Sequence, residues 1–336
     1  MALRKRIAVI GLGSIGRRHA RLLADRDDIE VELFDPNAAN IGIICGEIGS
    51  VKVYASFEET LKGKPDMVLI ATPHALHARQ VMAALESGID TLCEKPMSDR
   101  LDDARKMKEA AERTGKMLVI GFNLHFHPCL AAVKKALNAG TVGRVLHLHA
   151  RVGTYGTLVN SGSRYQAEAE GALIMDYAHQ PDIFYWLTRE TPEYVYASAA
   201  QTGDLPLSSN PNIIMMNCEY ASGMLASIHL NYIQEPGRHA YEIVGSDGWL
   251  ALDIQADRGI LTVGTRKDAA TRSETITFAR DEMYREEHRA FIDAVAGRCA
   301  PESPAASAIV SVAVCDAAFR SWKTHERVRI TPQTNN

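Results

Sequence analysis

Three glycines near the N-terminus have a spacing that suits phosphate binding. Residues 7–10 are all apolar, which is typical of a strand buried in a parallel sheet. The pattern G-x-G-x-x-G follows directly, in Gly11, Gly13 and Gly16. Its first glycine permits a tight turn, its second lets the backbone approach a pyrophosphate, and its third lets the next helix pack closely on the strand. We expect that helix to begin at Ser14 and Ile15 and to present its N–H groups to the phosphates of a dinucleotide.

An acidic residue stands where the ribose of such a dinucleotide is expected. Asp35 follows the second predicted strand, residues 31–34, and comes 19 residues after Gly16. A carboxylate at this place binds the ribose hydroxyls of NAD and repels the 2′-phosphate of NADP. The sequence therefore favours NAD, although Arg17 could reach a phosphate. The alternative is that Asp35 only caps the turn that follows it.

Two further strand ends carry polar residues that suit the same site. The predicted strands 67–71 and 91–94 lead into the sequences ATPH and CEKP. The carboxyl ends of strands in a parallel sheet meet at the edge where ligands bind. We therefore expect these residues to contact the cofactor: Thr72, Pro73, His74, His77, Glu94 and Lys95. A lysine there can act as a base where burial or nearby positive charge lowers its pKa, whereas a strand-end lysine is otherwise a solvated charge.

Strands and helices alternate along the first third of the chain. Six strands are predicted, at residues 7–10, 31–34, 51–54, 67–71, 91–94 and 117–122. Helices between them imply crossover connections, and hence an α/β fold with a doubly wound parallel sheet of the Rossmann type over residues 1–122. Helices are then predicted at 128–138 and 172–187, a series of strands from 193 to 278, and helices at 282–296 and 305–322. Residues 123–336 are thus predicted to form an α+β substrate-binding and oligomerisation domain with a largely antiparallel, open sheet.

Composition and charge restrict the class of protein. The 336 residues suit two domains, and 46% hydrophobic with 23% charged residues is ordinary for a soluble protein. The net charge of −4 argues against binding to nucleic acid or to an anionic membrane surface. We expect neither a signal peptide nor a transmembrane helix, because the apolar runs are too short. Six scattered cysteines are expected to be reduced thiols, and the protein is predicted to be cytoplasmic.

Several segments together resemble one family of oxidoreductases. They are GLGSIGRRHA, ATPHALHA, the Glu94-Lys95-Pro96 triplet, GFNLHFHP, EGALIMDYAHQPDIFYWL and MYREEHRAFIDAV, and they extend over nearly the whole chain. The chain resembles the glucose-fructose oxidoreductase, inositol dehydrogenase and rhizopine catabolism family, Gfo/Idh/MocA. This resemblance implies hydride transfer between nicotinamide and a sugar, an inositol or a related polyol.

The resemblance also implies roles for individual residues. Lys95, Asp176 and His179 match the catalytic set of the family, and the expected substrate contacts are Asn123, His125, Asp182 and Tyr284, besides the catalytic set itself. The chain departs from the family in two places. Asp176 precedes His179 by three residues instead of the common four, and Glu170 stands before Gly171 where the family usually has further glycines.

The chemistry of these residues suits removal of a proton from a carbinol. Hydride transfer from the carbon requires a base within hydrogen-bond reach of the hydroxyl. Lys95 and His179 are the candidates for this base, and Asp176 would orient them, because the predicted helix 172–187 places Asp176 and His179 one turn apart. Arg164 could bind a carboxylate or phosphate on the substrate, or be a surface charge.

Other interpretations of the sequence remain open. The histidine pairs at 125/127, 147/149 and 74/77 come without a third ligand at a typical spacing, so we predict no metal site. A redox-neutral sugar enzyme that uses bound NAD, such as a glycoside-cleaving enzyme, would carry the same fold. A regulator that senses NAD or sugar would also carry it, although the presence of Lys95 and His179 disfavours this. Because an open sheet buries its free face, often against another subunit, we expect a homodimer or homotetramer.

Overall fold

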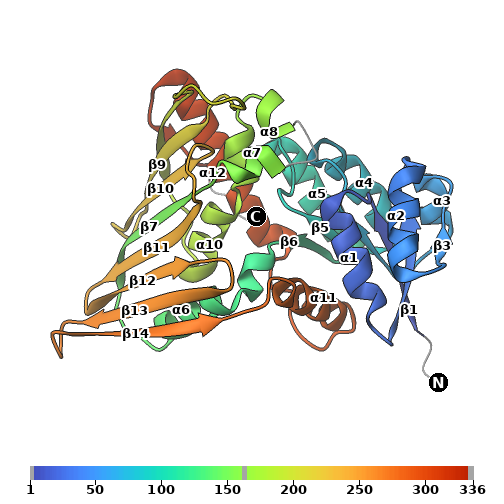
Figure 1. Cartoon of the computed structure of the whole chain (residues 1–336), viewed down its shortest axis with the longest axis horizontal. Helices are drawn as coiled ribbons and strands as arrows, with labels where there is room; N and C mark the ends of the chain where they lie inside the picture. The colour runs from blue at the N-terminus through green and yellow to red at the C-terminus, as the bar shows by residue number, and fades with distance from the viewer. Residues whose placement is uncertain (1–3, 161–164, 332–336) are drawn as a thin grey trace. The chain divides into compact units, whose positions relative to one another are not determined.

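The computed structural model describes residues 4–160 and 165–331 (Figure 1). Contacts divide the chain into two compact units. Unit 1 comprises Met1–Asn123 and Asp281–Ile309, and unit 2 comprises Leu124–Arg280 and Val310–Asn336. The predicted division into 1–122 and 123–336 has its boundary where the first segment of unit 1 ends, but residues 281–309 return to unit 1. They do so because Phe291 and Ile292 pack in the hydrophobic core of the parallel sheet.

Unit 1 contains the predicted doubly wound parallel sheet. Its strands are β1 (Lys5–Ile10), β2 (Ile29–Phe34), β3 (Lys52–Val53), β4 (Met67–Ile70), β5 (Asp90–Glu94) and β6 (Leu118–Gly121), in the order β3-β2-β1-β4-β5-β6. All pairs are parallel. The order reverses between β1 and β4, so the turns after these two strands flank the point where ligands bind in this architecture. The predicted fold class of this unit is confirmed.

Helices connect these strands. They are α1 (Ser14–Ala24), α2 (Ala38–Ile48), α3 (Phe57–Lys62), α4 (His77–Glu86) and α5 (Leu101–Thr114), with α11 (Glu282–Val295) from the second segment. Contacts place α1 beside α2 and α11, and α4 beside α5. The sequence did not predict α2, since Gly42 and Gly46 weaken its helical pattern. Its start is nevertheless capped, because the side chain of Asn37 accepts a hydrogen bond from the N–H of Ala39.

Unit 2 is built on one nine-stranded sheet. Its strands are β7 (Val145–Gly153), β8 (Tyr194–Ala200), β9 (Ile213–Glu219), β10 (Leu225–Asn231), β11 (Arg238–Gly245), β12 (Gly248–Ile254), β13 (Arg258–Thr265), β14 (Ala270–Thr277) and β15 (Val328–Arg329). Their order is β14-β13-β12-β11-β7-β10-β9-β8-β15, and in the described part of the unit only β7 with β10 is a parallel pair. The predicted α+β class with a largely antiparallel sheet is confirmed. The predicted series of strands began at 193 and lacked β7, which lies near the middle of the sheet.

Helices cover one face of this sheet (Figure 1). They include α6 (Pro128–Asn138), which packs on β12, β13 and β14, and α10 (His179–Thr188), which contacts β7. Burial alternates along the strands: in β9, Ile214, Met216 and Cys218 are buried, whereas Met215 and Asn217 are exposed. This pattern is typical of a sheet with one free face. The short helices α7 (Gly156–Asn160), α8 (Tyr165–Glu168) and α9 (Ala172–Asp176) also belong to this unit, as does α12 (Ala305–Thr324) from Val310 onward.

The predicted single helix at 172–187 is wrong. The structure divides it into α9 (Ala172–Asp176) and α10, with Tyr177 and Ala178 between them. Tyr177 leaves helical geometry, with φ −95° and ψ 29°. Pro181 lacks an N–H and could not bond to the carbonyl of Tyr177 in a continuous helix, so it suits the first turn of a new one. Asp176 and His179 therefore do not lie one turn apart on a common helix.

Within residues 4–160 and 165–331, one helix is long and apolar enough to cross a membrane by length and composition. It is α12 (Ala305–Thr324), and 67% of its apolar window is buried inside the protein. Burial of this kind is typical of a core helix, and Ile309, Val312 and Cys315 are each at most 1% exposed. The helix itself was predicted, at residues 305–322, and its small alanine and serine residues dilute its apolar character.

Candidate functional site

Residues 11–16, which carry Gly11, Gly13 and Gly16 and are called the glycine turn below, have the geometry that phosphate binding requires. Gly11 lies at φ +87°, and a Cβ on it would stand 2.8 Å from the main-chain nitrogen of Thr72. A Cβ on Gly16 would stand 1.8 Å from the carbonyl oxygen of Gly11, so only glycine fits either place. Gly13, the N-cap of α1, has nothing within 4 Å of its Cβ position and makes no side-chain cap. The backbone of Gly13 and the first N–H groups of α1 are thus open to an anion.

Asp35 directly follows β2 beside this turn. Its Oδ2 accepts hydrogen bonds from the N–H of Leu12, at 2.6 Å, and from the side-chain amide of Asn40, at 3.3 Å. Its Oδ1 accepts one from the N–H of Asn37, at 2.7 Å. Asp35 therefore does cap the turn that follows, as the alternative interpretation held. The same contacts attach its carboxylate to the glycine turn, which is the place that ribose recognition requires.

A buried histidine links the ends of β4 and β5. His77, only 1% exposed, has its ring nitrogens 2.9 Å from the carbonyl oxygens of Pro96 and Thr72. Burial lowers the pKa of His77, whereas the two carbonyl oxygens favour a proton on each ring nitrogen and oppose that shift. Thr72 also donates to the side chain of Gln80 at 2.6 Å. The structure thus gives His77 contacts to the main chain of two loops at which cofactor binding is expected. His74, nearby in the sequence, is half-buried, and its Nε2 lies 3.9 Å from Oδ2 of Asp99.

The Glu94-Lys95-Pro96 triplet forms the carboxyl end of β5. Glu94 Oε2 accepts a hydrogen bond from the main-chain N–H of Lys95 at 3.1 Å, and Glu94 Oε1 lies 2.8 Å from Nε2 of His19. The Lys95–Pro96 peptide bond is cis. The contact with His19 and the charge of Lys95 oppose burial and hold the pKa of Glu94 below its usual value. Lys95 itself is half-buried at the same sheet edge as the glycine turn.

Unit 2 holds the other two members of the expected catalytic set. Asp176, at the end of α9, accepts a hydrogen bond from the hydroxyl of Tyr232 at 2.6 Å. Burial, strengthened by the charge of Asp176, raises the pKa of Tyr232 well above its usual value. The ring of Tyr177 lies 5.6 Å from that of Tyr232. His179 is the first residue of α10 and is half-buried. Sequence reasoning missed Tyr232, because no sequence pattern indicates a contact between residues as far apart in the chain as Tyr232 and Asp176.

Two of the expected substrate contacts bind each other. Nε2 of His125 lies 2.6 Å from Oδ2 of Asp182, and these residues are 5% and 3% exposed. The His125 ring stacks on Trp186, with centroids 4.6 Å apart and planes at 11°. Nζ of Lys134 lies 3.8 Å above the Trp186 ring. These contacts fix the orientation of His125 inside unit 2 and connect α10 with the residues just before α6.

The remaining predicted contacts lie in different places. Asn123 is buried at the end of the first segment of unit 1, and Arg164 lies outside the described residues. Tyr284 belongs to α11 in unit 1, where its ring meets His19 edge to face at 5.4 Å and Arg18 lies 5.2 Å above it. Burial raises the pKa of Tyr284. This late tyrosine thus belongs to the cofactor-binding unit.

One group that sequence reasoning missed lies within unit 1. Side-chain atoms of His19, Glu94 and Glu287 lie within 4.8 Å of one another, and His288 contacts His19. The predicted absence of a metal site considered only histidine pairs close in sequence, whereas these residues come from α1, β5 and α11. The signal available was weak: two polar residues, Glu287 and His288, interrupt the apolar face of the last helix of unit 1.

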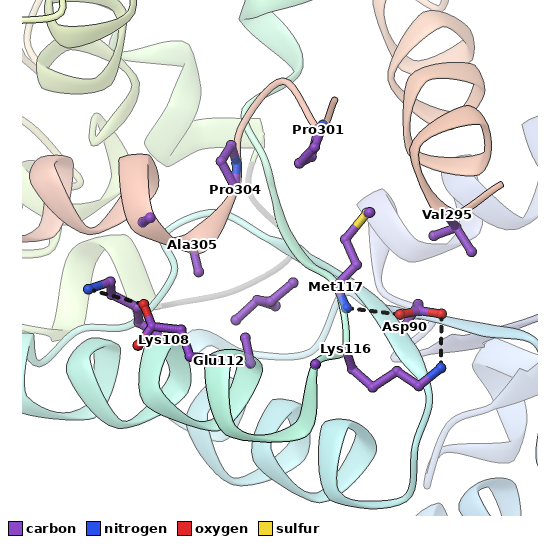
Figure 2. A pocket seen from close by; sticks show the side chains of 13 residues that line it. Asp90, Lys108, Glu112, Lys116, Met117, Val295, Pro301, Pro304 and Ala305 are labelled. Carbon is purple, nitrogen blue, oxygen red and sulfur yellow. Dashed lines mark hydrogen bonds and ion pairs between the residues drawn. The ribbon is translucent and has the colours of Figure 1, made fainter. Parts of the chain in front are cut away.

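A cavity of 520 Å³ lies elsewhere in unit 1 (Figure 2). It is lined by the C-terminal part of α5, the starts of β5 and β6 and residues 295–306. Asp90 accepts hydrogen bonds from the N–H of Met117, at 2.8 Å, and from Nζ of Lys116, at 3.4 Å. Because Asp90 begins β5 and Lys95 follows its end, this cavity lies at the sheet edge opposite the glycine turn. We do not assign it to the cofactor site.

Comparison with known proteins agrees with this geometry. The family described as an oxidoreductase family with an NAD-binding Rossmann fold matches residues 5–122, and the Gfo/Idh/MocA C-terminal domain matches residues 130–251, together more than half of the chain. An inositol 2-dehydrogenase of Rubrobacter xylanophilus is 26% identical over 344 aligned residues, which cover 98% of this chain and 94% of that protein. A 2,7-anhydro-N-acetylneuraminate hydratase of Escherichia coli is 25% identical over 264 residues, which cover 76% of this chain and 69% of that protein.

A solved structure has the same fold over almost the whole chain. It is an oxidoreductase from Agrobacterium radiobacter in complex with NAD⁺, L-tartaric acid and magnesium. Its TM-score is 0.87 at 20% identity, and the match covers 97% of this chain and 98% of that one. The two matched domains, the glycine turn and the fold lead to one assignment: the chain is an NAD-binding oxidoreductase of the Gfo/Idh/MocA family.

Proposed function

We propose that this enzyme oxidises a carbinol of a sugar, an inositol or a related polyol with NAD, or catalyses the reverse reduction. The observation that carries the proposal is the position of Lys95, which follows the end of β5 at the same sheet edge as the glycine turn. Glu94 holds the main chain of Lys95 there through the hydrogen bond to its N–H. Names of relatives, such as inositol 2-dehydrogenase, support a polyol substrate.

The residues of unit 1 fit the cofactor. Gly11 and Gly16 shape a turn that no larger residue fits, and Gly13 leaves space for a pyrophosphate over the start of α1. Asp35 is fixed beside that turn and would bind the ribose hydroxyls. When bound, the nicotinamide supplies the hydride acceptor. Thr72 and the residues after it would support the nicotinamide half, since they follow the end of β4 at the switch point of the sheet.

The protein's own residues would handle the proton and hold the substrate. In this proposal Lys95 or His179 takes the hydroxyl proton as hydride leaves, and Asp176, which is held by Tyr232, orients them. Asp182 and His125 would shape the part of unit 2 that meets a neighbouring hydroxyl. Arg164 remains a candidate for an acidic group on the substrate.

A redox-neutral reaction is the second candidate function, because one relative is named a hydratase and not a dehydrogenase. The Escherichia coli protein is named a hydratase, and hydration of a substrate involves no net oxidation. A redox-neutral reaction, in which NAD is reduced and reoxidised within one turnover, would use the same cofactor site and the same base.

The experiment is a screen with sugars, inositols, sugar acids and amino or anhydro sugars, with NAD and NADP in parallel. NADH is followed by its absorbance, and products are followed by mass spectrometry. Free NADH that accumulates with product supports the dehydrogenase. Product without free NADH favours the redox-neutral enzyme. Binding of NAD without any product from the panel favours the sensing regulator.

We also propose that the protein is a homodimer or homotetramer that buries the free face of the unit 2 sheet. Exposed apolar side chains on that face, Tyr196, Met215 and Leu225, lie on the neighbouring strands β8, β9 and β10. A free sheet face with such residues is commonly covered by another subunit. Light scattering at micromolar concentration tests this, and a monomer there would refute it.

A further inference from the structure

Four ionisable side chains gather in the interior of unit 1. His19 comes from α1, Glu94 from the end of β5, and Glu287 and His288 from α11. His19, Glu287 and His288 are each at most 2% exposed, and the side chain of Glu94 is 12% exposed. Burial of so many ionisable groups is costly unless their charges and protons are matched. The proposed roles of Lys95 and the cofactor residues do not by themselves require such a cluster.

Hydrogen bonds connect three of the four residues. Nε2 of His19 lies 2.8 Å from Oε1 of Glu94, and Nδ1 of His19 lies 2.7 Å from Nε2 of His288. An ionised carboxylate only accepts hydrogen bonds, so His19 Nε2 carries a proton that it donates to Glu94. A further proton lies between the two imidazoles. Burial lowers the pKa of His288 well below its usual value, which keeps its ring neutral.

Glu287, unlike Glu94, lies in an environment that favours its protonated form. Both of its carboxylate oxygens are buried, and neither has a hydrogen-bond partner among the residues that the structure describes. Its carboxylate lies within 4.8 Å of the interacting atoms of Glu94 and His19. Burial, together with the negative charge of Glu94, raises the pKa of Glu287 well above its usual value. Two carboxylates this close cannot both be charged without a large cost, so Glu287 is the one that stays neutral.

Glu94 connects this cluster to the proposed base through the main chain of Lys95. The second oxygen of Glu94 accepts the hydrogen bond from the Lys95 N–H at 3.1 Å. We propose that Glu287 keeps its proton beside an ionised Glu94, and that this pair, with Glu94 held by His19 and, through His19, by His288, positions Lys95 for proton transfer. The inference rests on the proposed function in that Lys95 is the base. Glu94, Glu287, His19 and His288 are positioning residues here.

A divalent cation is the competing explanation of the cluster, since one imidazole and two carboxylates could bind it. Ligands about 2.0–2.2 Å from a tetrahedral metal stand roughly 3.3 Å or more apart. The His19–Glu94 contact of 2.8 Å is shorter than this and has the length of a direct hydrogen bond. The geometry therefore favours a proton over a metal ion between these two side chains.

The first test detects the proton without any activity. Infrared difference spectra between wild type and Glu287→Gln should show the C=O stretch of a buried carboxylic acid in the wild type alone. In Glu94→Gln, loss of the neighbouring negative charge should lower the pKa at which this band disappears, by about one unit or more. A wild-type spectrum with ionised carboxylates only at neutral pH overturns the proposal. So does a stoichiometric metal ion in the purified protein that chelator removes and that Glu287→Gln fails to bind.

The second test concerns positioning. As pH rises and Glu287 loses its proton, two negative charges face each other and kcat should fall. Glu287→Gln cannot ionise, so this alkaline limb should move up by about one pH unit or more. Glu287→Ala should lower kcat by about tenfold, and glutamine should recover most of that loss. Glu282→Gln, an exposed change on the same helix, is the control and should keep the wild-type profile.

The outcomes separate this inference from the proposed function. An acid band with an unshifted alkaline limb in Glu287→Gln overturns the positioning role. If Lys95→Ala keeps full turnover, the proposed base is wrong and the positioning role falls with it, while the infrared result still decides whether Glu287 is protonated.

Discussion

The N–H of Leu12 donates a hydrogen bond of 2.6 Å to Oδ2 of Asp35. This contact joins the glycine turn to the residue that would bind the ribose, so the two parts of the cofactor site hold each other in place. Asp35 is 9% exposed, and its other oxygen accepts the N–H of Asn37. A carboxylate fixed in this way loses little side-chain entropy when a ribose binds.

The first prediction concerns cofactor preference. Asp35→Asn keeps an oxygen for the Leu12 N–H but removes the negative charge. Loss of a charged hydrogen bond to the ribose should raise the KM for NAD by about ten- to a hundredfold and improve the relative use of NADP. Steady-state kinetics with both cofactors measures this, with the exposed Asp27→Asn as control. An unchanged preference would mean that Asp35 only caps its turn.

A substitution in the glycine turn should weaken NAD binding without affecting folding. Gly13 has a backbone conformation open to other residues, φ −64° and ψ −169°, and its Cβ position is empty. Gly13→Ala should therefore fold as the wild type does, yet bind NAD at least about tenfold more weakly, because the methyl group takes the space of the pyrophosphate. Calorimetric titration with NAD and thermal unfolding measure the two effects.

Two other glycines complete this experiment. Gly46→Ala also adds a methyl group to open space in unit 1, within α2, and should leave NAD binding unchanged. Gly16→Ala should lose stability even without cofactor, since its Cβ would overlap the carbonyl of Gly11. Tight NAD binding by Gly13→Ala would show that the pyrophosphate does not pass over this residue.

The local parts of the site could be predicted from the sequence because they depend on short-range patterns. The apolar run before Gly11 predicts β1 and the place where it ends. The polar residues Thr72 and Lys95 likewise mark the carboxyl ends of β4 and β5 to within a few residues. Contacts between distant segments could not be predicted in this way. The return of α11 to unit 1 and the meeting of His19 with His288 depend on packing, and neither leaves a periodic trace in the sequence.

The break between α9 and α10 had a local signal that the hydrophobic pattern obscured. Ile174, Ile183 and Phe184 are all fully buried, so their spacing imitates one amphipathic helix. Pro181 was the residue to weigh against it, because a proline favours the first turn of a helix over its interior. The break matters for function, since it sets the relative directions of Asp176 and His179.

The proposed base gives the next prediction. Lys95→Ala should lower kcat by about two to four orders of magnitude, because the group that removes the hydroxyl proton is lost. NAD affinity should stay close to that of the wild type, since the glycine turn and Asp35 are untouched. Stopped-flow measurement of hydride transfer and NAD titration check both parts, with the exposed Lys62→Ala as control. Undiminished turnover would remove Lys95 from the mechanism.

The buried pair of His125 and Asp182 should matter for stability as well as for the substrate. Asp182→Asn replaces a charged acceptor 2.6 Å from the imidazole by a neutral one, in a place where neither side chain reaches water. The free energy of unfolding should fall by about 1–3 kcal/mol, and the KM for the substrate should rise. Denaturant unfolding checks the first effect. The exposed Asp257→Asn should change neither quantity, and equal stability of the two variants would contradict the expected strength of the pair.

Acid sensitivity is expected from the cap of α6. The side chain of His127 accepts a hydrogen bond from the N–H of Cys129 at 3.2 Å, and it can do so only while its Nδ1 carries no proton. Burial lowers the pKa of His127 from 6.5 to about 4. A folded-state pKa below the unfolded one contributes stability that is complete above pH 6.5 and is lost as pH falls towards about 4. That contribution reaches up to about 3 kcal/mol.

Asparagine offers a matched test of this cap, because it accepts the same hydrogen bond and does not titrate. His127→Asn should lose less stability than the wild type between pH 6.5 and about 4, the range set by the shifted pKa. His127→Ala should be about 1 kcal/mol less stable at neutral pH through loss of the cap, with an equally shallow pH dependence. Denaturant unfolding at a series of pH values measures these curves, with His325→Asn at an exposed position as control. If His127→Asn and the wild type lost stability equally over this range, another group would be responsible for the acid sensitivity.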